Sequence, residues 1–144
     1  MKLDFWQLSR DPAEKVVAAI AARVLDSGER VLVVSADEAQ RAAISKALWG
    51  ATAESFLANG EAGGEDDARQ PVLLSAKLTD ANRASHVIYA DGAFREPSGF
   101  ARAFLLFDES TLESARTTWK ALGDRDGMER AFYRQERGNW VLVA

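Results

Sequence analysis

The chain of 144 residues is long enough for one domain with one hydrophobic core, and its 47% apolar and 28% charged residues are ordinary globular usage. It contains no cysteine, which excludes disulfides, zinc–thiolate sites and a cysteine nucleophile, and no apolar run approaches the ~20 residues that cross a membrane. The net charge of −4 argues against a broad DNA-binding surface, which needs clustered Lys and Arg.

The N-terminal segment predicts a strand followed by a helix. Lys2 to Leu8 alternates loosely between apolar and polar residues and lacks the features of a signal peptide, so we expect a strand in a cytoplasmic protein. Asp11 is expected to cap the helix that follows, with Pro12 in its first turn. Apolar residues four apart predict an amphipathic helix that ends at Ser27-Gly28: Val16, Ile20 and Val24.

A second strand and helix follow the first pair. The apolar run within Arg30 to Ser35 predicts a strand covered on both faces. Ser35-Ala36-Asp37-Glu38 has the pattern of a capping box, and the helix that it opens should reach about Trp49. Alternation of strands and helices indicates an α/β fold with a parallel sheet and right-handed crossovers.

The rest of the chain is expected to add strands and one more helix. Gly60 to Gln70 is rich in glycine and acidic residues and predicts a loop. Ser110-Thr111-Leu112-Glu113 is expected to open a helix, and Glu136-Arg137-Gly138-Asn139 to form the turn of a hairpin. Three further strands are predicted: Pro71 to Ser75, Ser85 to Ala90, and Ala103 to Phe107.

Motifs for catalysis or cofactor binding are missing from the sequence. His86 is the single histidine and starts an apolar strand, which favours a structural role. The strand–helix junctions at Leu8 to Pro12 and Ser35 to Glu38 lack the glycine-rich turn that binds phosphate, and the second carries two carboxylates. Asp66-Asp67 has the composition of a solvated acidic turn rather than a metal site.

Two clusters of residues have alternative interpretations. Arg116, Trp119 and Lys120 share one helix face, where two cations beside an indole suit an acidic peptide with a free carboxylate. Trp119 could equally belong to the core, with the cations on a solvated flank next to Glu113 or Asp124. Trp49 and the segment Ser55-Phe56-Leu57 are either a protein contact or core closure.

The whole chain resembles the chi subunit family of DNA polymerase III. Several segments carry the resemblance through their order and spacing: Asp4 to Leu8, Gly28 to Val33, Ala47-Leu48-Trp49, Glu54 to Leu57, Gly60 through Gln70-Pro71-Val72, Phe104 to Asp108, and Arg116 to Lys120. Ala58-Asn59 departs from the Pro-His that the family often has, and the segment from Gly123 onward matches poorly.

The resemblance implies a single domain over residues 1–144, with a three-layer Rossmann-like fold, a mostly parallel central sheet and helices on both faces. It implies a non-catalytic protein without cofactor that contacts DNA only indirectly. One expected partner is psi or another clamp-loader subunit, bound through Trp49, Phe56 and Leu57. The other is the acidic C-terminal tail of single-stranded-DNA-binding protein, bound through three residues of one helix: Arg116, Trp119 and Lys120.

Two other functions remain as alternatives from the residues alone. An α/β fold of this kind often binds a nucleotide at the carboxyl edge of its sheet, as an enzyme would. Direct binding of single-stranded DNA through aromatic, Arg and Lys side chains of the C-terminal region is the third possibility, and the negative net charge argues against it.

Overall fold

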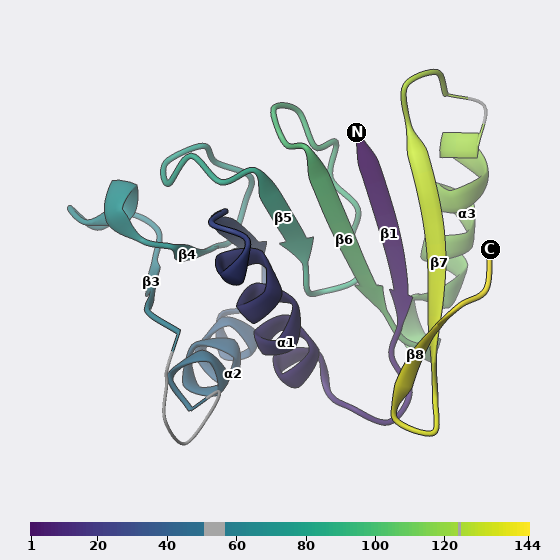
Figure 1. Ribbon diagram of the computed structural model, residues 1–144, viewed down its shortest axis with the longest axis horizontal. Helices are drawn as coiled ribbons and strands as arrows, with labels where there is room; N and C mark the ends of the chain where they lie inside the picture. The colour runs from purple at the N-terminus through teal and green to yellow at the C-terminus, as the bar shows by residue number, and fades with distance from the viewer. Residues whose placement is uncertain (51–56, 124) are drawn as a thin grey trace.

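A computed structural model, which describes residues 1–50, 57–123 and 125–144, shows a mixed α/β fold built on one eight-stranded sheet (Figure 1). Strand order is β3-β4-β2-β5-β6-β1-β7-β8. The strands span β1 Lys2–Gln7, β2 Val31–Val34, β3 Asn59–Glu61, β4 Val72–Ser75, β5 His86–Tyr89, β6 Arg102–Phe107, β7 Glu129–Glu136 and β8 Asn139–Leu142. The α-helices of the described residues are α1 Ala13–Asp26, α2 Glu38–Trp49 and α3 Leu112–Gly123.

Neighbouring strands run parallel everywhere except at the final hairpin, where β7 and β8 are antiparallel. The prediction of a mostly parallel sheet is therefore confirmed. The hairpin turn at Arg137-Gly138 has positive φ at both residues, which matches the right-handed twist of the strands that it joins. The sequence pattern placed this turn correctly.

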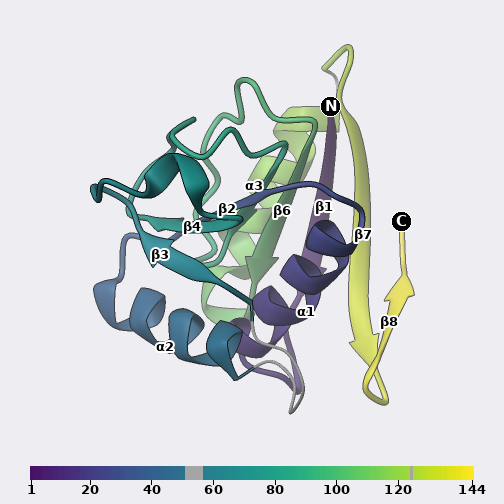
Figure 2. The ribbon, with the colours of Figure 1, turned by 60° about the vertical axis from the view of Figure 1, so that its left-hand side comes forward.

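The central strands of the sheet are buried on both faces. Alternate residues of β2 point to opposite sides, so Val31 and Val33 pack with α1 and α2, whereas Leu32 and Val34 belong to the core under α3. Figure 2 shows α1 and α2 on the side of the sheet away from α3. The run Val31–Val34 is apolar at every position because helices cover both faces of this strand.

Helix starts differ from the predicted caps by one or two residues. Asp11 does not cap α1; Pro12 is the N-cap, and the Asp11 carboxylate accepts hydrogen bonds from Lys15 and Gln135 instead. For α2 the cap is Asp37 rather than Ser35, since its carboxylate accepts from the backbone N–H groups of Ala39 and Gln40. Short polar side chains stood at several neighbouring positions, and the sequence did not distinguish among them.

The predicted helix start at Ser110-Thr111-Leu112-Glu113 was also misplaced. The capping box is formed by Asp108 and Thr111, and it opens a short 3₁₀ turn, Glu109–Thr111, that leads into α3. The predicted loop between Gly60 and Gln70 was partly wrong as well, because β3 pairs with β4 and a second 3₁₀ turn covers Asp67–Arg69. An edge strand of three residues is too short to show an alternating pattern.

An ion pair lies inside the sheet on β1. Asp4 is fully buried, and the guanidinium of Arg102 on the adjacent β6 donates to its carboxylate, with the Nε–Oδ2 bond at 2.9 Å. The ammonium of Lys2 lies 3.8 Å from the other carboxylate oxygen. This pair supports the strand that also carries Phe5, a residue of the site described next.

Candidate functional site

A cavity of about 720 Å³ lies between α3 and the sheet, on the face away from α1 and α2. We call it the α3 pocket. Three cationic and several apolar side chains line it together with few polar groups: Phe5, Gln7, Phe107, Leu112, Ala115, Arg116, Trp119, Lys120, Phe132, Arg134 and Ala144. In the described part of the chain, no Asp or Glu is among the lining residues, although the whole chain carries a net charge of −4.

Aromatic rings form the floor of the α3 pocket. The indole of Trp119 is half-buried and meets the ring of Phe5 edge-on at 5.1 Å between centroids, and that of Phe132 at 6.2 Å. Phe107 adjoins Phe132 at 5.7 Å. The indole packs against the core, as one interpretation of Trp119 expected, and it also lines the pocket, whereas its contact with a peptide stays a prediction.

Arg130 on β7 fixes the position of Trp119. Its guanidinium carbon lies 4.1 Å from the centroid of the indole ring, within the range of a cation–π contact. The same guanidinium donates a hydrogen bond to the backbone carbonyl of Trp119. The sequence reasoning missed Arg130, because a contact between a helix and a later strand leaves no periodic signal along the chain.

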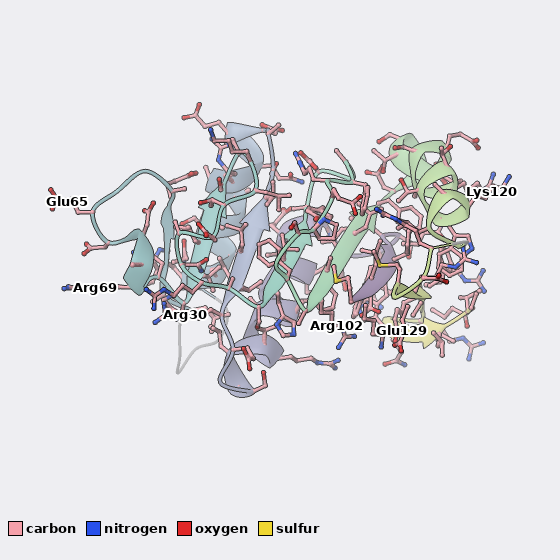
Figure 3. All side chains as sticks on the ribbon, turned by 90° about the horizontal axis from the view of Figure 1, so that it is seen from above. Arg30, Glu65, Arg69, Arg102, Lys120 and Glu129 are labelled. Atoms are coloured by element: carbon pink, nitrogen blue, oxygen red, sulfur yellow. The ribbon has the colours of Figure 1, made fainter. Side chains whose placement is uncertain are left out.

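The three cations of the pocket form no buried ion pair with other described residues. Arg116 pairs with Glu113 at 3.2 Å, as one interpretation expected, but both side chains are largely exposed. Lys120 has no ion pair among the described residues, and Figure 3 shows it reaching outward from α3. Arg134 on β7 pairs with Glu136 of the same strand at 2.7 Å. Exposed pairs of this kind contribute little stability.

Chemically, the α3 pocket suits an anionic chain with an apolar side chain. Arginine and lysine bind carboxylates through charge-assisted hydrogen bonds, and the aromatic floor offers apolar surface beside them. The structure brings Arg116, Trp119 and Lys120 to one cavity, as their helical spacing predicted. It adds Phe5, Phe107 and Arg134, which the sequence reasoning did not single out because they come from other elements.

The second set of predicted contact residues lies at the end of α2, far from α3 (Figure 1). Trp49 is the last residue of α2 and its side chain is 47% exposed, whereas Leu57 is half-buried against the core under α1 and α2. The backbone N–H of Leu57 donates to the carbonyl of Leu48 at 2.8 Å. Phe56 lies outside the described residues.

A more polar hollow of about 500 Å³ lies at the carboxyl ends of β1 and β6, where an α/β enzyme would bind a nucleotide. Four acidic residues line it, with one cation: Asp11, Glu14, Asp91, Asp108 and Arg10. A hydrogen bond from Gln135 lowers the pKa of Asp11, and one from Ser110 lowers the pKa of Asp108. These carboxylates are therefore ionised at neutral pH and would repel a phosphate group.

His86 has the surroundings of a structural residue. Its Nδ1 lies 2.7 Å from the hydroxyl oxygen of Ser85, and its ring stacks on Phe104. Burial lowers the pKa of His86, so the imidazole is neutral near pH 7. In the part of the chain that the structure describes, no group of three or more His, Cys, Asp or Glu side chains could hold a metal ion.

Comparison with known proteins decides the family. The sequence profile described as DNA polymerase III chi subunit, HolC, matches residues 1–129. The chain belongs to this family. It is 31% identical over 115 residues to the DNA polymerase III subunit chi of Escherichia coli K12, an alignment that covers 75% of this chain and 76% of that relative. Membership of the chi family places the chain among proteins of DNA replication.

The match to the chi family includes α3 and ends at the first residue of β7. Arg116, Trp119 and Lys120 lie within it, and nearly the whole β7–β8 hairpin lies beyond it. None of the helices among the described residues is long and apolar enough to cross a membrane. The helix that forms one wall of the α3 pocket thus lies within the family match. The β7–β8 hairpin, which forms the opposite wall, lies almost entirely outside it.

Proposed function

We propose that the chain is a non-catalytic adaptor of the DNA polymerase III holoenzyme. One surface binds the acidic C-terminal tail of single-stranded-DNA-binding protein, and a second binds the clamp loader through psi or another subunit. The chain meets DNA only through these partners. In this proposal it acts in the cytoplasm as one Rossmann-like domain without a cofactor.

The charge of the α3 pocket is the observation that supports this proposal most. Among the described residues, three cations and no Asp or Glu line a cavity in a protein whose net charge is −4. The carboxylates that pair with Arg116 and Arg134 are exposed and offset their charges only weakly, so the cations still repel one another and an external anion relieves that repulsion. The aromatic floor adds selectivity, since it favours an anion with an apolar group attached over a free inorganic ion.

Each predicted residue has a role in this binding mode. Arg116 holds the terminal carboxylate of the peptide, because guanidinium groups bind carboxylates in a bidentate geometry. Lys120 attracts the acidic side chains that precede it, and its outward position suits a charge that lies near solvent. Trp119 contacts the apolar final residue, with its indole held in place by Arg130.

A pull-down of a tagged form of the chain from the cells that naturally produce it tests the adaptor function. Recovery of single-stranded-DNA-binding protein together with clamp-loader subunits is the expected result. Loss of the first partner alone from an Arg116→Glu variant would assign it to the α3 pocket. If the wild-type chain recovered neither partner, the proposed function would be wrong.

The clamp-loader surface is proposed around Trp49, at the end of α2, and Leu57, together with Phe56, which lies outside the described residues. The exposed indole of Trp49 is a large apolar group of the kind that anchors protein interfaces. Trp49→Glu is expected to reduce recovery of clamp-loader subunits about tenfold, because a charge replaces an apolar anchor. Recovery of single-stranded-DNA-binding protein measures the other surface in the same sample and should not change. Equal recovery of clamp-loader subunits by both forms would refute the assignment.

A thermal-shift screen distinguishes the adaptor from the alternative, a nucleotide-binding enzyme. ATP, NAD and related ligands are expected to leave the melting temperature of the chain unchanged, since ionised carboxylates line the hollow at the sheet's carboxyl edge. A peptide ending in Asp-Ile-Pro-Phe, the kind of tail that the resemblance to the chi family implies for single-stranded-DNA-binding protein, should raise the melting temperature. Stabilisation by one nucleotide and none by the peptide would favour the enzyme.

A further inference from the structure

The wall of the α3 pocket opposite Arg116 carries a cation of its own. Arg134 belongs to β7, and it lines the same cavity as Arg116. Because side chains alternate along a strand, Arg134 points to the same face as Phe132, the ring that packs against Trp119. The chain therefore supplies cations to this cavity from two separate elements, α3 and β7.

Arg116 and Arg134 lie at the same end of the pocket. Arg134 pairs in register with Gln7 at the end of β1, and Gln7 also lines the cavity. Figure 1 shows α3 and β7 running in opposite directions, so the first half of α3, with Arg116, lies beside the last half of β7. Lys120 follows one helical turn later, toward the other end of the cavity.

No Asp or Glu is among the described residues that line the pocket, and Ala144, the last residue of the chain, lines it as well. Each guanidinium group has its counterion on its own element, Glu113 for Arg116 and Glu136 for Arg134, and both ion pairs are exposed. Exposed pairs are weak and exchange readily with a competing anion. One carboxylate placed between the two walls would interact with both cations at once.

We propose that Arg134 is the second cation for the terminal carboxylate of the bound peptide, which is held between α3 and the β7–β8 hairpin. This inference rests on the proposed function, and it deepens the description of that site. The residue lies beyond position 129, where the match to the chi family ends. Arg134 thus determines specificity for a free chain end.

The test measures dissociation constants for two peptides that end in Asp-Ile-Pro-Phe, one with a free carboxylate and one amidated. For the wild type we expect the free-acid peptide to bind more tightly. For Arg134→Gln we expect that peptide to bind about five- to tenfold more weakly, the size of one charge-assisted hydrogen bond at a partly solvated site. Binding of the amidated peptide should be the same in both proteins.

Two further variants distinguish recognition from a structural role of Arg134. Arg137→Gln removes an exposed cation of the same hairpin that does not line the pocket, and it should leave both constants unchanged. Glu136→Gln frees Arg134 from its ion pair and should tighten binding of the free-acid peptide about twofold.

The possible outcomes separate this inference from the proposed function. If the wild type bound the peptide but Arg134→Gln kept the same ratio between the free-acid and amidated forms, the role of Arg134 would be refuted and the proposed function would stand. If the wild type bound neither peptide, both the role of Arg134 and the proposed function would be refuted. A loss for Arg134→Gln that is equal for both peptides would also overturn the carboxylate assignment.

Discussion

Reversing the charge of Arg116 or Lys120 is expected to weaken binding of a peptide ending in Asp-Ile-Pro-Phe by at least about thirtyfold, roughly 2 kcal/mol. Each substitution removes an attraction to the anionic peptide and adds a repulsion in its place. Both side chains are exposed on α3, so Arg116→Glu and Lys120→Glu should fold as the wild type does. Fluorescence anisotropy of a labelled peptide measures the change.

Lys15→Glu is the matched control for these two variants. It alters the net charge by the same amount at an exposed position of α1, outside the α3 pocket. Binding to this variant should stay within about twofold of the wild type, because charges farther apart than a Debye length are largely screened. Raising the salt concentration should weaken wild-type binding. Titration curves unchanged in both α3 variants would contradict the assignment of the site.

Replacing Arg102 with methionine is expected to lower the free energy of unfolding by about 3 kcal/mol. The substitution leaves the carboxylate of Asp4 fully buried with only the more distant Lys2 ammonium as a partner. An uncompensated charge inside the protein is costly, whereas the apolar stem of the new side chain preserves packing. Urea denaturation followed by circular dichroism gives the unfolding free energy.

Two further variants distinguish the cost of an unpaired buried charge from the general effect of a substitution on the free energy of unfolding. Asp4→Leu combined with Arg102→Met removes both charges, and we expect it to be more stable than Arg102→Met alone. Arg23→Met changes an exposed arginine of α1 and should alter stability by less than about 0.5 kcal/mol. A loss below about 1 kcal/mol for Arg102→Met would mean that the pair contributes little.

The sequence predicted the fold well where burial leaves a periodic pattern. The run Val31–Val34 is apolar at every position because helices cover both faces of the sheet, and this pattern identified a central parallel strand. The three-residue strand β3 was missed because so short an edge strand shows no alternation. Asp11 was taken for a helix cap because the sequence did not reveal its competing partner, Gln135, far away in the chain.

The candidate site was predicted in part, for a similar reason. Arg116, Trp119 and Lys120 lie one turn apart on one helix, so their spacing alone placed them on one face. Arg130 and Arg134 come from β7, and only the folded sheet brings them to α3. Phe5 belongs to the N-terminal strand, more than a hundred residues earlier, and its place in the floor likewise follows from the strand order.

The indole N–H resonances of the four tryptophans give the most direct test of peptide binding in the α3 pocket. In a titration of ¹⁵N-labelled protein with the Asp-Ile-Pro-Phe peptide, the Trp119 resonance should shift and saturate. Trp6 is buried on the other face of the sheet and should stay in place as an internal reference. A Trp119 resonance that does not move at saturating peptide would contradict the account.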